Sequence, residues 1–409
     1  DGLGIKGFKF PIQENLENPE VVVDHKFRII ATSSLIGLND LSPAFLNRFT
    51  IVYINEQLNS IKDQIPQFIR CLSPYSFDES KGTKDINFIS NSVEKTLIKD
   101  NILTSLNLSK CVNGFFKLTQ RFPQASKESI LKFCFDACIY HTSTIPEMDT
   151  EFINVLLSSL AEDDRKDTEF DAFHFKEAES TRKVMATLVA CSVIGLHVIL
   201  VGKTGSGKTT AAMAFSRMNQ FSSKTSTTPI IAFNGETQLD ELYGYFTIEK
   251  GNFTLHQGEL SKAMSGGEVF IADELNLADQ QIIQSLNVAI EPSCGEHIIL
   301  PVTGSSIEIK EGFFFIGCQN DLTMNGRRPI PESIRKKILI VDYPENSSQD
   351  LQALCTSIAS HFTFDHSIPK YTADLIERMK NEPSLRIKPW SLREVRTLFR
   401  RIAYFKTKQ

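Results

Sequence analysis

Short apolar runs recur in the second half of the chain, and each is followed by glycine or polar residues. Residues 197–201, 267–272 and 312–318 are rich in β-branched and aromatic side chains, which is typical of strands buried on both faces of a parallel sheet. Apolar positions at helical spacing in 129–140 and 151–160 predict helices. The pattern therefore predicts an α/β fold, with a parallel sheet sandwiched by helices and further all-α subdomains beside it.

A glycine-rich loop directly follows the first predicted strand. The sequence Gly202-Lys-Thr-Gly-Ser-Gly-Lys-Thr209 has the spacing G-x4-G-K-T, and Thr210 opens a helix. Such a loop turns backbone N–H groups toward phosphates, and the helix N-terminus adds the positive end of its dipole. We expect Lys208 to reach the β- and γ-phosphates of a nucleotide and the Thr209 hydroxyl to bind Mg²⁺. The predicted nucleotide-binding residues are Gly202, Thr204, Gly205, Ser206, Gly207, Lys208, Thr209 and Thr210.

Polar side chains end the other two predicted strands. Asp273 and Glu274 follow the second, about 65 residues after Lys208, and suit the metal and water side of a nucleotide site. Asp273 is expected to hold Mg²⁺ through water, and Glu274 to orient and deprotonate the attacking water. Asn320 ends the third strand, at the edge where ligands bind in open α/β sheets. It is a candidate sensor of the γ-phosphate, with a strand-end turn residue as the alternative.

A weak internal repeat connects the two halves of the chain. Residues 27–34, 41–53 and 107–110 resemble residues 313–320, 329–341 and 391–394, at offsets of 286, 288 and 284 residues. We infer two copies of one module, of which the first lacks its phosphate-binding half. The predicted boundaries are 1–56 for the end of the first α/β subdomain, 57–160 for its helical lid, 161–171 for a charged linker, 172–345 for the second α/β subdomain and 346–409 for an incomplete second lid. Two β-hairpin inserts are predicted, at 245–256 and 298–310.

Taken together, these motifs resemble those of AAA+ ATPases over essentially the whole chain, in the tandem-module branch of the midasin type, to which dynein is a more distant relative. Three stretches carry the resemblance beyond the glycine-rich loop: Asp273-Glu-Leu-Asn-Leu-Ala278 with the helix after it, the hairpin at 298–304, and Leu41-Ser-Pro-Ala-Phe-Leu-Asn-Arg-Phe49. The resemblance implies ATP and Mg²⁺ as ligands. It also implies that Asn320 is the first sensor and Arg393 the second.

The resemblance further assigns an arginine finger, which in this family reaches into the site of a neighbouring module. Arg48 occupies the finger position of the first copy, whereas Lys336 occupies it in the second. Lys cannot make a bidentate phosphate contact, so Arg335 or the pair Arg327-Arg328 is the candidate there. The resemblance places the second sensor at Arg393, and Ser391-Leu-Arg-Glu394 is a capping box that predicts a helix with Arg393 in its first turn. An exposed arginine on a solvated helix face is the alternative. In the first copy, Ser34 and Ser109 occupy the two sensor positions. This implies that the first copy either binds nucleotide without hydrolysing it or does not bind nucleotide.

The function implied is that of an ATP-driven remodelling machine, whose partners are adjacent AAA+ modules of the same larger chain and a protein substrate. A midasin-like role would be the release of assembly factors from nuclear precursors of the large ribosomal subunit. Two alternatives remain: a nucleotide-regulated scaffold with little hydrolysis, and a dynein-type motor, although the sequence has no long heptad segment for a stalk. Because no following module is present to donate a finger, we expect slow hydrolysis by this chain.

The composition limits the classes of binding partner and the cellular compartment that we expect for this chain. With 44 Lys and Arg against 49 Asp and Glu, the net charge of −5 gives no sign of nucleic-acid or membrane-surface binding. Eight cysteines in 409 residues predict free thiols in a reducing, intracellular compartment, the nucleus or nucleolus if midasin-like and otherwise the cytoplasm. Cys134, Cys138 and His141 share a helical face, and we expect core packing rather than a metal site. The N-terminus resembles neither a translation start nor a signal peptide, so an excerpt of a longer chain is expected.

Overall fold

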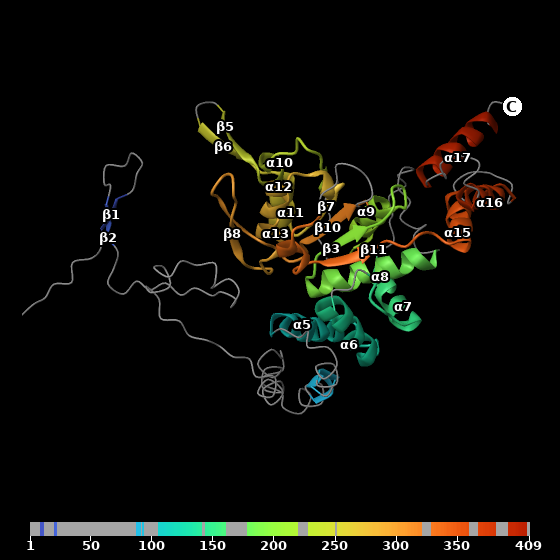
Figure 1. The fold of residues 1–409 in the computed structure, drawn as a ribbon, viewed down its shortest axis with the longest axis horizontal. Helices are drawn as coiled ribbons and strands as arrows, with labels where there is room; N and C mark the ends of the chain where they lie inside the picture. The colour runs from blue at the N-terminus through green and yellow to red at the C-terminus, as the bar shows by residue number, and fades with distance from the viewer. Residues whose placement is uncertain are drawn as a thin grey trace, which may run out of the picture. The chain divides into compact units, whose positions relative to one another are not determined.

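The structure is a computed structural model, which describes residues 9–11, 20–22, 87–90, 92–93, 105–140, 144–160, 178–219, 228–249, 252–320, 329–359, 367–381 and 392–406. The chain divides into two compact units, residues 1–61 and 62–409. In the first unit, β1 (Lys9–Pro11) pairs with β2 (Glu20–Val22) in an antiparallel ribbon. All other described elements belong to the second unit (Figure 1).

A five-stranded parallel sheet forms the centre of the second unit. Its strands are β3 (Val198–Val201), β4 (Ile230–Ala232), β7 (Val269–Asp273), β10 (Phe314–Gln319) and β11 (Leu339–Asp342), in the order β11-β3-β10-β7-β4. Every neighbouring pair is parallel. All six residues of the central strand β10 are buried, as expected of a strand covered on both faces. The predicted α/β class is confirmed.

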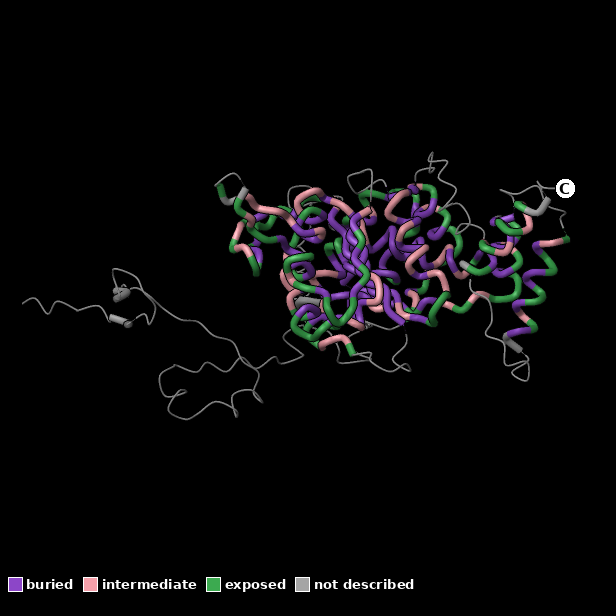
Figure 2. Tube along the Cα trace, turned by 90° about the horizontal axis from the view of Figure 1, so that it is seen from above, coloured by how far each residue is buried: buried purple, intermediate pink, exposed green. Residues whose placement is uncertain are grey.

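Helices cover the sheet and share its apolar core. Figure 2 shows the buried residues concentrated along the strands and the inner faces of these helices. One large apolar cluster joins the sheet to the following helices, and in it the rings of Phe270 and Phe315 stack with centroids 5.8 Å apart. The helices around the sheet are α8 (Glu179–Ile194), α9 (Lys208–Met218), α10 (Leu239–Tyr243), α11 (Glu259–Gly266), η3 (Leu275–Leu277), α12 (Gln280–Ser285), α13 (Asn287–Ile290) and α14 (Glu332–Arg335).

Both predicted hairpins are confirmed. Strand β5 (Tyr245–Glu249) pairs with β6 (Asn252–His256), and β8 (His297–Ile299) pairs with β9 (Ser306–Glu308), each pair antiparallel. The base of the first hairpin requires glycine at position 244. Its φ is +100°, and a Cβ there would lie 2.1 Å from the carbonyl oxygen of His256.

A group of helices precedes the sheet in the chain and packs against α8. These are α5 (Ser105–Arg121), α6 (Lys127–Phe135), the π-helix η1 (Asp136–Tyr140) and α7 (Thr150–Ser158). Both α5 and α7 contact α8, below which they lie in Figure 1. Residues 105–140 and 144–160 are therefore mostly helical, as the apolar spacing predicts.

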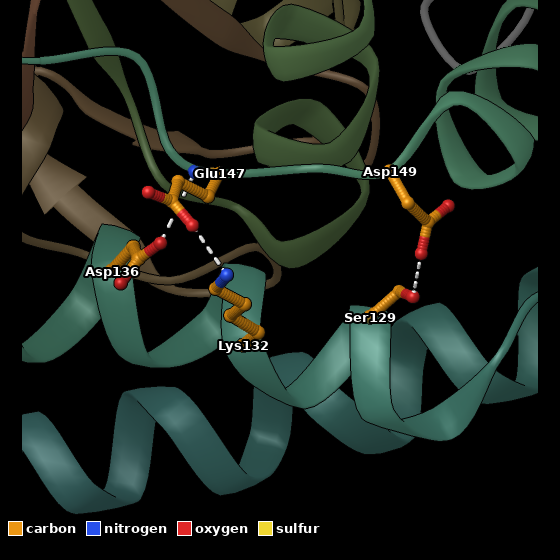
Figure 3. Close-up of polar contacts among 5 residues, drawn as sticks. All are labelled: Ser129, Lys132, Asp136, Glu147 and Asp149. Carbon is orange, nitrogen blue, oxygen red and sulfur yellow. Dashed lines mark hydrogen bonds and ion pairs between the residues drawn. The ribbon is translucent and has the colours of Figure 1, made fainter.

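Polar contacts hold the segment between η1 and α7 along α6 (Figure 3). The ammonium of Lys132 pairs with Glu147, and the Ser129 hydroxyl donates to Asp149. The backbone N–H of Glu147 donates to Asp136 Oδ2 at 3.1 Å. Asp149 also accepts from the N–H of Phe152 at 2.7 Å and so caps α7. These contacts fix the residue at which α7 begins. They thereby help to position α7, which packs on α8.

In the part of the chain that the structure describes, three helices follow the sheet: α15 (Ser348–Ala359), α16 (Ser367–Asn381) and α17 (Leu392–Lys406). They share an apolar cluster of their own, which includes Cys355, Val395 and Phe399. The predicted second lid is thus helical where the structure describes it, and α17 begins at the residue before Arg393, as the capping box predicts.

Several sequence predictions fall outside the described residues. They concern the first-copy segments 27–34 and 41–53 with Ser34 and Arg48, the linker 161–171, His141, the pair Arg327-Arg328, and Ser391. Ser109 lies in the first two turns of α5. Within the described residues, the helices are too short or too polar to cross a membrane.

Candidate nucleotide-binding site

The glycine-rich loop joins β3 directly to α9 at the carboxyl edge of the sheet. Gly205 and Gly207 have φ angles of +79° and +104°, in the left-handed region that glycine enters without strain. Gly207 caps the helix, so that Lys208 is already its first residue. The N–H groups of this first turn have no acceptor within the helix. The loop therefore brings backbone N–H groups and the positive end of the helix dipole to one place.

Lys208 is the cation of this site. Its side chain is buried, and Nζ donates to the carbonyl oxygens of Gly202 at 2.7 Å and Lys203 at 2.8 Å. Nζ also donates to Asn320 Oδ1 at 3.0 Å, across the pocket from the loop. A buried ammonium group requires such partners, because desolvation of a charge is costly. These contacts hold the ammonium group at the end of β10, beside the loop.

The acidic pair lies on the other side of the helix N-terminus. The Thr209 hydroxyl donates to Asp273 Oδ1 at 2.8 Å, and the same oxygen accepts from the N–H of Glu274 at 3.1 Å. Glu274 has a φ of +52° and is the one non-glycine residue with positive φ among the residues that the structure describes. Such a conformation is strained for a residue with a Cβ and tends to occur at functional sites.

The Asn320 amide joins the two sides of the pocket. Nδ2 donates to both carboxylate oxygens of Glu274, at 2.6 and 2.7 Å, while Oδ1 accepts from Lys208. An amide can form both contacts because it has an NH₂ group that donates and a carbonyl oxygen that accepts. The sequence prediction placed Asn320 near a γ-phosphate; in the structure it bridges the cation and the candidate general base.

These side chains line one pocket. Its walls are formed by Gly205, Gly207, Lys208, Thr209, Thr210, Asp273, Glu274, Cys318, Gln319 and Asn320. Cys318 and Gln319 were not among the predicted site residues, because the sequence does not distinguish them from ordinary residues at the end of a buried strand. Burial raises the pKa of the Cys318 thiol well above its usual value, so the thiol is neutral. A hydroxyl and a carboxylate in contact are oxygen donors of the kind that Mg²⁺ prefers, so the residues fit a magnesium nucleotide.

The remaining predicted residues lie around the pocket or away from it. Gly202 is buried next to Tyr343, and a Cβ at position 202 would lie 3.1 Å from the Tyr343 carbonyl oxygen. Ser206 Oγ lies 3.4 Å from Lys208 Nζ, and Thr204 is exposed. Arg335 is exposed at the end of α14, which precedes β11 and so lies at the amino edge of the sheet, opposite the pocket. It cannot serve the pocket of its own sheet.

Sequence comparisons agree with this geometry. Residues 197–337 match the family model described as an AAA domain of the dynein-related subfamily. Midasin from Dictyostelium discoideum is 25% identical over 423 aligned residues, which cover 87% of this chain and 7% of that protein. Midasin from Giardia intestinalis is 26% identical over 203 residues, or 48% of this chain and 4% of that protein. The uncharacterized protein YojN from Bacillus subtilis is 32% identical over 174 residues, or 41% and 54%.

The fold, the site and these matches define the class of this protein as AAA+. More particularly, the chain is of the midasin type, and residues 197–337 form an AAA domain of the dynein-related subfamily. It spans a small part of the two midasins and about half of the bacterial relative.

Proposed function

We propose that this chain binds ATP with Mg²⁺ at the pocket around Lys208 and hydrolyses it. The observation that carries the proposal is the convergence of a buried cation, a hydroxyl–carboxylate pair and an amide-held glutamate at one helix N-terminus. Phosphoryl transfer depends mainly on positioning and on charge stabilisation, and these are the groups it requires.

Each group has a separate role in the proposal. The ammonium of Lys208 and the N–H groups of the loop bind the phosphates. Thr209 and Asp273 would hold Mg²⁺, which when bound neutralises charge on the phosphate oxygens. Glu274 accepts a proton from the attacking water once the nucleotide has drawn Asn320 toward its phosphates.

The proposal also includes three arginines that do not line the pocket. Arg393, in the first turn of α17, would bring a cation from the lid to the phosphates. Arg48 and Arg335 would act as fingers toward neighbouring modules. The position of α14 at the amino edge supports this for Arg335, because a finger acts in a pocket other than that of its own sheet.

Binding is tested by titrating the purified chain with a fluorescent ATP analogue in the presence of Mg²⁺. The Lys208→Ala variant should bind about 100-fold more weakly, because a charge-assisted hydrogen bond contributes about 1.5–3 kcal/mol. Lys203→Ala is the matched control: it removes a lysine of the same loop whose ammonium pairs with Glu345. Equal affinity of the two variants would contradict the proposed site.

At the level of the whole protein, we propose a mechanoenzyme that remodels a macromolecular assembly. The midasin likeness over most of the chain supports this. On that basis the substrate would be assembly factors on precursors of the large ribosomal subunit, the partners would be adjacent AAA+ modules, and the location would be the nucleus or nucleolus. This step is tested by purifying the full-length Glu274→Gln variant, which should remain bound to such precursors, and asking whether the precursors co-purify with it. If no precursors co-purify, the result counts against this step.

The scaffold alternative has one observation in its favour. Glu274 is fully engaged by the amide of Asn320, with both of its oxygens hydrogen-bonded. If nucleotide binding leaves this contact in place, ATP would fix geometry between modules without being consumed. The two functions separate in single-turnover hydrolysis, which only the enzyme shows.

A further inference from the structure

Asn276 is a fully buried amide directly beneath the nucleotide pocket. It lies two residues after Glu274, within the short helix η3, and its side chain has 0% exposure. Nδ2 donates to the backbone carbonyl oxygen of Asn320 at 2.9 Å. Oδ1 is also buried and has no hydrogen-bond partner among the described residues.

Burial of this amide has a stability cost that a leucine of similar size would avoid. An unsatisfied buried polar atom costs about 1–3 kcal/mol, and the neighbouring Leu275 is buried in the apolar cluster beneath the sheet. Packing alone therefore does not account for an amide at this position. The contact that the amide does make points to the pocket.

That contact lies where the sheet no longer fixes the backbone. The pairing of β10 with β3 ends at Gln319, opposite Val201, and the Gln319 carbonyl oxygen accepts from the N–H of Gly202. Asn320 is the next residue, so no strand pairing orients its carbonyl group. The hydrogen bond from Asn276 orients this carbonyl group instead. Asn276 belongs to the same turn as Glu274.

We propose that Asn276 is a positioning residue, which holds the backbone of Asn320 so that its amide spans Lys208 and Glu274. This inference rests on the proposed ATPase function, since it concerns the same pocket. Asn276 itself touches none of the reacting groups. It joins η3, after β7, to the end of β10, and thereby sets the distance between the sensor and the general base.

The test combines structure and kinetics on the Asn276→Leu variant, which keeps the volume and removes the donor. A crystal structure of this variant should show the Asn320 amide displaced from Glu274. An unchanged contact would overturn the proposal whether or not the protein hydrolyses ATP. Asn276→Asp, which keeps a polar group of the same size but replaces the donor by an acceptor, should give the same displacement if the leucine variant fails to fold.

The kinetic arm separates a positioning role from a loss of stability. We expect the single-turnover rate to fall about 10- to 100-fold, as for other residues that orient a reacting group through a partner, with less than a threefold change in ATP affinity. In an Asn320→Ala background the Asn276→Leu substitution should have no further effect; an equal loss in both backgrounds overturns the proposal.

Ser261→Ala is the matched control for this arm. Ser261 is also fully buried and donates to a backbone carbonyl, that of Tyr243 at 3.0 Å, but it does not line the pocket. It should lower stability and leave hydrolysis unchanged. A wild-type protein that neither binds nor hydrolyses ATP would instead contradict the proposed function, and the crystal structures would still decide the role of Asn276.

Discussion

The same strands lead to two very different ends of the sheet. At the carboxyl edge, β3, β7 and β10 are followed by Gly202, Glu274 and Asn320, and the side chains of Glu274 and Asn320 contact each other in a pocket. At the amino edge, His197 directly precedes β3, and its ring packs against Phe313 and Phe315. One sheet therefore has a carboxyl edge whose polar side chains line a pocket and an amino edge that is filled by packed side chains. We call the carboxyl edge the open edge and the amino edge the closed edge.

The closed edge continues into the contact between α5 and α8. Four buried cysteines lie in this region: Cys111, Cys134, Cys138 and Cys191. Burial raises the pKa of each thiol, so all four are neutral and pack as small apolar groups. Among the described residues no cluster of His, Cys, Asp and Glu is arranged to hold a metal ion. The expectation of core packing for Cys134 and Cys138 is confirmed.

The largest effect on stability is expected at the closed edge, on acidification. Burial, helped by the cation of Lys110, lowers the pKa of His197 to about 4, and its Nδ1 accepts from the N–H of Phe315 at 3.1 Å. In the unfolded chain the pKa is about 6.5. The stabilisation from neutral His197 is therefore complete above pH 6.5 and is lost as the pH falls toward 4, by about 3 kcal/mol.

Urea unfolding of the wild type and of His197→Gln, at pH 7 and pH 4, measures this contribution. The variant cannot titrate, so it should lose about 3 kcal/mol less stability than the wild type over this interval. Parallel losses in the two proteins would mean that His197 is not held in the neutral form.

An intermediate effect is expected at the open edge. Asp273→Asn removes the charge from the carboxylate that accepts from Thr209. We expect the Mg²⁺ concentration required for ATP binding to rise about 10- to 100-fold, measured by Mg²⁺ titration at fixed nucleotide. Stability should change little, because an asparagine oxygen still accepts the hydroxyl. A large fall in melting temperature with unchanged Mg²⁺ dependence would assign Asp273 a structural role and weaken the contrast between the edges.

The smallest effect is expected where α5 meets α8. Gly114 is buried in the interior of α5, and a Cβ there would lie 3.4 Å from both Cys134 Sγ and the Ile194 side chain, at ordinary contact distance. Gly114→Ala should therefore fit and stabilise the helix by about 0.5–1 kcal/mol, seen as a higher urea midpoint. Destabilisation would show that α5 and α8 lie closer together than the structure has them.

Much of the open edge could be predicted from sequence, because its residues are adjacent to recognisable strands. The spacing of the glycines, Lys208 and Thr209 fixes a loop between a strand and a helix, and Asp273 and Glu274 directly follow an apolar run. Both hairpins were predicted from local turn residues. These features depend on short stretches of chain, where periodicity and turn chemistry suffice.

Contacts between distant segments could not be predicted in this way. The strand order, the bridging of Lys208 and Glu274 by Asn320, and the contact of Asn276 with the Asn320 carbonyl all depend on pairing across the sheet. Asn276 in particular resembles any polar residue of a short turn. The same holds for His197, whose burial results from the packing of β10 and not from its neighbours in sequence.

The most direct test of the central claim compares single-turnover ATP hydrolysis by the wild type and by Glu274→Gln. The substitution keeps the size of the side chain and one oxygen that can accept from Asn320, but it removes the base. We predict that ATP affinity stays within about threefold, whereas hydrolysis falls about 10²- to 10⁴-fold. Equal rates in the two proteins would contradict the claim that the carboxyl edge of this sheet is an ATPase site.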